Sequence, residues 1–163
     1  YMSDIEWHFI GHLQTNKLKM VLPYVSLIQS VDSCRLLDAV NAWGAANGKE
    51  IRVLLEPHVA AEESKQGFSR EDISDILSDA EKFGNIRFCG IMGMATNTDD
   101  EQEIRRCFQE IAALGKQLLN NAELLNHTEL AISMGMSDDY LLAIEEGSTM
   151  VRIGSSIFGE RQY

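Results

Sequence analysis

The chain has 163 residues, of which 45% are hydrophobic and 24% are charged, and its formal net charge is −11. These values are ordinary for one globular domain, and the strong acidity argues against nucleic acid or an anionic membrane surface as a partner. No apolar run is long enough to span a bilayer, and Tyr1 to Glu6 lack the features of a signal peptide. Three widely spaced cysteines without metal-ligand spacing predict free thiols in a reducing cytosol. We therefore expect a cytoplasmic protein.

Short apolar runs alternate with helical patterns along the whole chain. Strands are expected near residues 7–11, 27–31, 51–55, 86–91, 130–134 and 150–153. The runs are continuous rather than alternating, which is typical of strands that are buried on both faces of a parallel sheet. The chain is therefore predicted to be a single α/β domain with helices outside the sheet.

Helices are expected between these strands, and capping residues mark several of their ends. The expected ranges are 17–22, about 33–46, a helix from residue 69, about 99–121, and 140–145. Ser69 to Asp72 resembles a capping box, and Asn47 with Gly48 is a typical helix stop. Ser137 to Asp139 is predicted to cap the helix from Tyr140 to Glu145.

The number of strand–helix units predicts a barrel fold that is two units short. Eight such units close a (β/α)8 TIM barrel, which typically needs ~250 residues, and this chain shows six strands. The first strand begins within a few residues of Tyr1. We therefore expect residues 1–163 to form a partial barrel that lacks about the first two units, which would lie before Tyr1.

The stretch from Gly147 to Gly159 carries the clearest chemical signal. Arg152 interrupts a short apolar run, and a charge inside a buried strand is costly unless it is paired. Gly154 and Ser155 follow at once, and small residues let backbone N–H groups approach an anion closely. The phosphate site of such barrels commonly lies after the last two strands. The alternative is a last strand whose arginine merely pairs with a carboxylate.

Ser137 lies at the end of the preceding predicted strand. Neighbouring parallel strands end at the same rim, so Ser137 and the Gly154-Ser155 loop are expected to lie close together. The helix that begins near Ser137 would add a favourable dipole for an anion. The simpler alternative is that Ser137 only caps that helix.

Other candidate ligands carry weaker signals. His8 and His12 flank a strand end and need not share a face, so we interpret them as structural or pocket-lining residues. The acidic residues around His58 lack a recognised ligand spacing. No metal site is predicted.

Five motifs together resemble the pyridoxal phosphate homeostasis proteins, which are single-domain relatives of the alanine racemase barrel. The motifs are Trp7–Lys17, Ser30–Ser33, Glu62–Phe68, Ser133–Ser137 and Gly147–Gly159. The resemblance implies binding of pyridoxal 5′-phosphate (PLP), a role in vitamin B6 balance, and no established enzymatic turnover.

The resemblance also assigns roles to individual residues. Arg152 would face the pyridine nitrogen, and Ser137, Gly154 and Ser155 would hold the phosphate. Met134 and His8 would line the pocket, and Lys65 falls where related racemases carry an arginine near the cofactor. An arginine at the pyridine nitrogen can only donate a hydrogen bond, so the ring would stay a poor electron sink.

Two departures from the family pattern stand out. The Schiff-base lysine of the family precedes the Trp7 motif, so this sequence starts too late to contain it. Pro57 lies where the family strand continues, and a proline there should weaken the end of that strand.

Three functions follow from these observations. The favoured one is a non-catalytic PLP carrier or regulator that is a monomer or a weak homodimer, with association through strand edges at residues 7–11 and 150–153. The second is a PLP-dependent amino-acid racemase, which would need a second catalytic base that is normally supplied by a C-terminal β-domain. The third, a barrel enzyme acting on a phosphosugar, explains the phosphate loop but not the other motifs.

Overall fold

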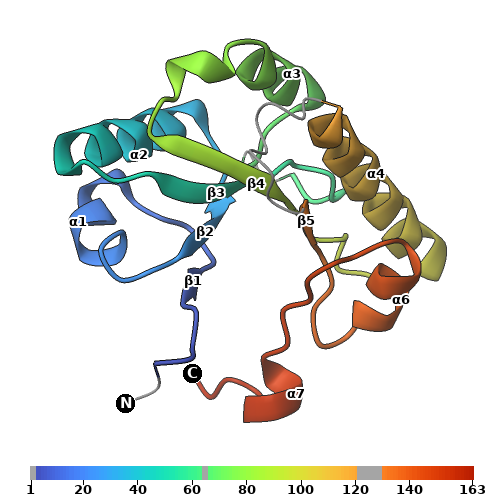
Figure 1. The fold of residues 1–163 in the computed structure, drawn as a ribbon. Coiled ribbons are helices and arrows are strands. Elements are labelled where there is room, and N and C mark those ends of the chain that lie inside the picture. Colours follow the sequence, from blue (N-terminus) through green and yellow to red (C-terminus); the bar gives the residue numbers. More distant parts are fainter. Residues whose placement is uncertain (1–2, 64–65, 121–129) are drawn as a thin grey trace.

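The structure is a computed structural model that describes residues 3–63, 66–120 and 130–163 (Figure 1). Its centre is a parallel sheet of five strands in sequential order. The strands are β1 (His8–Phe9), β2 (Leu27–Val31), β3 (Ile51–Leu55), β4 (Ile86–Met92) and β5 (Ala131–Ser133). The described residues thus form a curled half-barrel, whereas the sequence had predicted six strands of a larger barrel.

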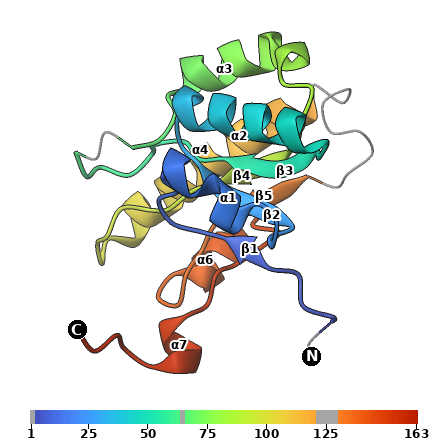
Figure 2. The same cartoon turned by 90° about the vertical axis from the view of Figure 1, so that its left-hand side faces the viewer.

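Helices cover the outer, convex face of this sheet (Figures 1 and 2). The long ones are α2 (Cys34–Asn47), α3 (Arg70–Ser78) and α4 (Glu101–Leu119). The shorter ones are η1 (Thr15–Lys17), α1 (Leu18–Val21), η2 (Ala80–Lys82) and α6 (Tyr140–Glu145). A last short helix, α7 (Ser155–Phe158), has no buried residue and stands away from the sheet near the C-terminus (Figure 1). None of the described helices is both long and apolar enough to cross a membrane.

Two separate apolar clusters lie on the two faces of the sheet. The larger cluster joins strand residues such as Val53 to helix residues such as Leu37 and Phe108, so it fills the space between sheet and helices. The smaller cluster contains Leu27 and Leu54, together with Cys89 and Met92. Successive residues of a strand point to opposite faces, so the smaller cluster lies on the inner, concave face.

The predicted sixth strand at residues 150–153 is wrong beyond its first residue. Only Met150 pairs, in an isolated parallel bridge with Ser133. The backbone N–H of Arg152 then donates to the carbonyl of Gly135 at 2.9 Å. Gly135 has a φ of 99°, a conformation that glycine adopts readily. The pairing of the two segments is shifted there, so a regular parallel ladder does not continue.

Local capping follows the sequence at two helices and departs from it at a third. Ser69 and Asp72 form the predicted capping box at α3, and Gly48 ends α2 in the left-handed conformation with a φ of 61°. The predicted cap of α6 by Ser137 to Asp139 is wrong in that no side chain forms a capping hydrogen bond. Asp139 is the residue that precedes α6, and Oδ1 of its side chain accepts from the Met136 N–H at 2.8 Å instead of capping the helix.

Candidate functional site

A chain of hydrogen-bonded polar side chains crosses the inner face of the sheet. The Ser133 hydroxyl and the Gln29 amide are buried on β5 and β2, and the hydroxyl donates to Gln29 Oε1 at 2.7 Å. Gln29 Nε2 lies 3.0 Å from Nδ1 of His8 on β1. At the other end, Arg152 Nη1 donates to Ser133 Oγ at 2.7 Å, and Nη2 donates to the carbonyl of Gly93 at 3.1 Å.

The hydrogen bonds of this chain run in one direction, from Arg152 towards Gln29. A guanidinium can only donate, so Ser133 Oγ accepts from Arg152, and its own hydrogen goes to Gln29 Oε1. The amide nitrogen of Gln29 therefore faces His8 as a donor, and Nδ1 of His8 accepts. A neutral His8 ring consequently carries its proton on Nε2.

The site is polarised by partly buried charges. Burial lowers the pKa of Arg152, and the negative charges of Glu56 and Asp139 oppose that effect. Burial also lowers the pKa of His8, which favours its neutral form near pH 7. Glu56 lies just beyond β3, and burial together with the charge of Asp32 raises the pKa of Glu56 to about 7, against the opposing charges of Arg152 and His12.

A second group of donors lies in the loop that leads into α7. The backbone N–H groups of Gly154 and Ser156 both point at Ser137 Oγ, at 3.3 and 3.2 Å. Gly154 and Ser156 are exposed and Ser137 is partly exposed. Two N–H groups and one hydroxyl therefore converge at a solvent-accessible point, which is the arrangement that suits an oxyanion.

The structure brings most of the sequence-predicted residues into these two groups. Arg152 and His8 are the ends of the inner-face chain, and Ser137 and Gly154 meet in the loop, where Ser155 follows Gly154. Met134 lies in neither group, and its place in a pocket lining stays a prediction. Its side chain is fully buried in the outer cluster, because Met134 and Ser133 point to opposite faces of the chain. Lys65 lies outside the described residues.

Three residues of the site were not predicted from the sequence: Gln29, Ser133 and Glu56. A signal was present for Gln29, because an amide in the middle of an apolar strand must find a partner when it is buried. Glu56 carried no such signal, since its position next to Asp32 and Arg152 depends on how the sheet curls.

The described residues contain no group of three His, Cys, Asp or Glu side chains that could hold a metal ion. Two of the thiols, Cys89 and Cys107, are buried, and Cys34 is exposed.

Comparison with known proteins relates this sequence to one family. The sequence profile of the alanine racemase N-terminal domain matches residues 3–162. The pyridoxal phosphate homeostasis protein of Aquifex aeolicus is 37% identical over 161 residues, which are 98% of this chain and 69% of that protein. The human protein of the same name is 38% identical over 167 residues, 98% of this chain and 60% of its own length.

Solved structures show the same similarity. PipY of Synechococcus elongatus, in a crystal structure with PLP bound, is 28% identical with a TM-score of 0.81, over 97% of this chain and 72% of that one. An unknown protein of Bifidobacterium adolescentis is 38% identical with a TM-score of 0.83, over 94% and 61%. The chain thus spans between 60 and 72% of the length of these relatives.

Proposed function

We propose that this chain, which belongs to the pyridoxal phosphate homeostasis protein family, binds PLP at the inner face of its curled sheet and acts as a carrier or regulator of that cofactor. The observation that carries the proposal is the joint placement of a partly buried arginine and a loop of anion donors at the end of β5. Family membership and the PLP in the PipY structure support the choice of ligand.

The phosphate is proposed to lie at the Ser137 loop. The N–H groups of Gly154 and Ser156 already converge on one oxygen atom, so a phosphate oxygen can take the same hydrogen bonds. Ser137 would then turn its hydroxyl hydrogen toward the phosphate, and Ser155 would line the same turn. Backbone donors suit this chain, because its net charge of −11 gives no long-range attraction for an anion.

The pyridine ring is proposed to lie against Arg152. A guanidinium has five N–H donors, and the two described bonds of Arg152, to Ser133 and to Gly93, leave donors for a ring nitrogen. His8, at the far end of the same chain, can line the ring. The residues present therefore fit PLP in both charge and hydrogen-bonding capacity.

Arg152 also affects how strongly the bound ring can withdraw electrons, because of what it can offer to the pyridine nitrogen. PLP, when bound, supplies a ring that withdraws electrons, and it does so most strongly when its nitrogen is protonated. Arg152 has no proton to give up at neutral pH and can only donate a hydrogen bond. The site holds the ring in its less activated form, which suits a carrier better than a racemase.

A titration with PLP tests the proposal. We expect the spectrum of PLP to change on addition of the protein, and the affinity to fall more than roughly tenfold in Arg152→Gln and roughly tenfold in Ser137→Ala, because each removes a hydrogen bond to a charged or ring group. Arg70→Gln and Ser78→Ala on α3 are the matched controls and should bind as the parent does. Equal affinity in all five proteins would overturn the site.

An amino-acid racemisation assay separates the carrier from the enzyme. We expect no conversion of L-alanine to D-alanine above the rate with free PLP. If the protein converts L-alanine to D-alanine and the Arg152→Gln variant does not, the protein is a racemase and the carrier proposal is wrong.

Four further properties are proposed with this function. Residues 1–163 form one domain, and the curled sheet is the equivalent of part of a (β/α)8 barrel, as the family fold suggests. The protein works in the cytoplasm. It is a monomer or a weak homodimer, with the short edge strand β1 as the contact, and sedimentation at two concentrations would measure this.

A further inference from the structure

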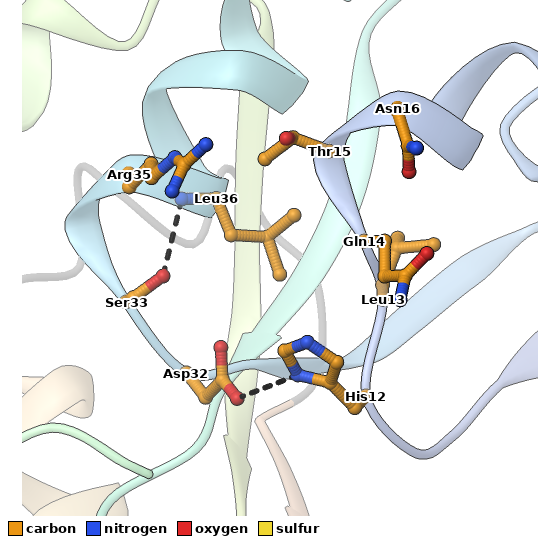
Figure 3. A pocket seen from close by; sticks show the side chains of 9 residues that line it. All are labelled: His12, Leu13, Gln14, Thr15, Asn16, Asp32, Ser33, Arg35 and Leu36. Atoms are coloured by element: carbon orange, nitrogen blue, oxygen red, sulfur yellow. Dashed lines mark hydrogen bonds and ion pairs between the residues drawn. The ribbon is translucent and has the colours of Figure 1, made fainter. Parts of the chain in front are cut away.

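A cavity of about 490 Å³ opens at the carboxyl ends of β1 and β2 (Figure 3). Its volume falls within the range of small-molecule sites, about 300–1,000 Å³. Leu13 and Leu36 are buried and form its apolar floor. None of the residues assigned above to PLP is among those that line it, so an occupant of this cavity would be distinct from PLP.

One wall of the cavity holds a largely buried carboxylate. The Asp32 side chain is only 8% exposed, and no hydrogen bond to it is found among the described residues. Among the described residues, its one ion-pair partner is His12, whose Nδ1 lies 3.7 Å away, which is too far for a hydrogen bond. His12 is charged only when it is protonated, and its side chain is 56% exposed. A buried carboxylate in this state favours a cationic partner.

The neighbouring strand makes this local field more negative. Glu56 follows β3, and the charge of Asp32 contributes to its raised pKa. Two carboxyl groups at adjacent strand ends repel each other when both are ionised. A cation at Asp32 would relieve that repulsion.

The opposite wall holds a cation. Arg35, in the first turn of α2, is exposed, and no carboxylate pairs with it in the described ranges. Figure 3 shows Arg35 and Thr15 on one side of the opening, Asp32 and His12 on the other, and Leu36 between them. The cavity therefore presents one negative and one positive group across an apolar floor.

We propose that this cavity binds a free α-amino acid, with its ammonium group at Asp32 and its carboxylate at Arg35. The Leu13 and Leu36 side chains would contact the aliphatic carbons. A simple anion fits less well because Asp32 repels it, and an amine without a carboxylate leaves Arg35 unpaired. The Gln14 and Asn16 amides at the rim favour an amino acid with a polar side chain.

The first experiment titrates each of the twenty common L-amino acids singly into the full chain by calorimetry, with and without saturating PLP. We expect at least one to bind more tightly than about 1 mM, with the same affinity in the presence of PLP. Failure of all twenty to bind overturns the proposal. Loss of binding when PLP is present also overturns it, because the amino acid would then occupy the PLP site. Neither result affects the PLP proposal.

The second experiment tests the two charges with ligand analogues and matched variants. For the amino acid that binds best, the amine without the carboxylate and the acid without the amino group should each bind at least roughly tenfold more weakly. Asp32→Asn and Arg35→Gln should cause losses of the same size. Asp38→Asn on α2 and Arg70→Gln on α3 should cause none, and circular dichroism would check that all four are folded. Unchanged binding in both Asp32→Asn and Arg35→Gln would contradict the assignment, as would full binding of either truncated analogue.

Discussion

The two faces of the five-stranded sheet differ in what they bury. The outer face is mostly apolar, and Val53, Leu55 and Ile91 on it are fully buried under the helices. The inner face has a small apolar cluster and a hydrogen-bonded chain that runs from His8 to Arg152. Buried polar groups contribute little net stability, so the outer face accounts for most of the folding, and the inner face is the one that we propose for the ligand. The following changes test that division.

The largest loss of stability is expected on the outer face. Phe108 of α4 is fully buried between helix and sheet. Phe108→Ala should lower the free energy of unfolding by about 3–5 kcal/mol, because it leaves a cavity as well as removing buried area. Urea denaturation measures this loss. A loss below about 1 kcal/mol would mean that the helices are not held by this cluster.

The second effect concerns pH and the inner face. The ordinary pKa of a glutamate is 4.5, and that of Glu56 is about 7 in the folded chain. Between these values the folded protein holds a proton that the unfolded chain has lost, so stability should fall as the pH rises from 4.5 to 7. The shift corresponds to at most about 3 kcal/mol.

Glu56→Gln isolates this contribution, because the amide cannot ionise. The difference in unfolding free energy between the variant and the parent protein should favour the variant more at pH 8 than at pH 5. A difference that does not change with pH would contradict the raised pKa of Glu56 in the folded chain.

A third change breaks the hydrogen-bonded chain at its middle. Ser133→Ala takes away the acceptor of Arg152 Nη1 and the donor to Gln29 Oε1. Unpaired buried polar groups cost about 1–3 kcal/mol, and Arg152 loses the partner that orients it. We expect this loss of stability together with weaker PLP binding, measured by urea denaturation and by PLP titration. Lower stability with unchanged PLP affinity would mean that these hydrogen-bonded side chains have only a structural role.

The smallest effect is expected on the outside of the helices. Ser69→Ala removes the capping box of α3 and should cost about 1 kcal/mol. PLP affinity should not change, because α3 packs on the face opposite the site. If this variant bound PLP more weakly, the two faces would not be independent.

The parts of the fold that follow from local chemistry could be predicted from the sequence. The continuous apolar runs gave β2 and β3 at residues 27–31 and 51–55, and the Ser69–Asp72 pattern gave the capping box. The sequence could not show that pairing stops after Met150, because the conformation of Gly135 on the neighbouring segment decides the register there. The resemblance supplied Arg152 and Ser137 as candidates. The roles of Gln29, Ser133 and Glu56 depend on contacts across three strands, which a single sequence does not display.

The most direct test of the account is a crystal structure of the chain with PLP. We expect the phosphate within hydrogen-bonding distance of Ser137 Oγ and of the N–H groups of Gly154 and Ser156, with the pyridine nitrogen facing the Arg152 guanidinium on the inner face. A phosphate bound elsewhere, or a ring that does not contact Arg152, would contradict the central claim that this face of the sheet is built to hold PLP.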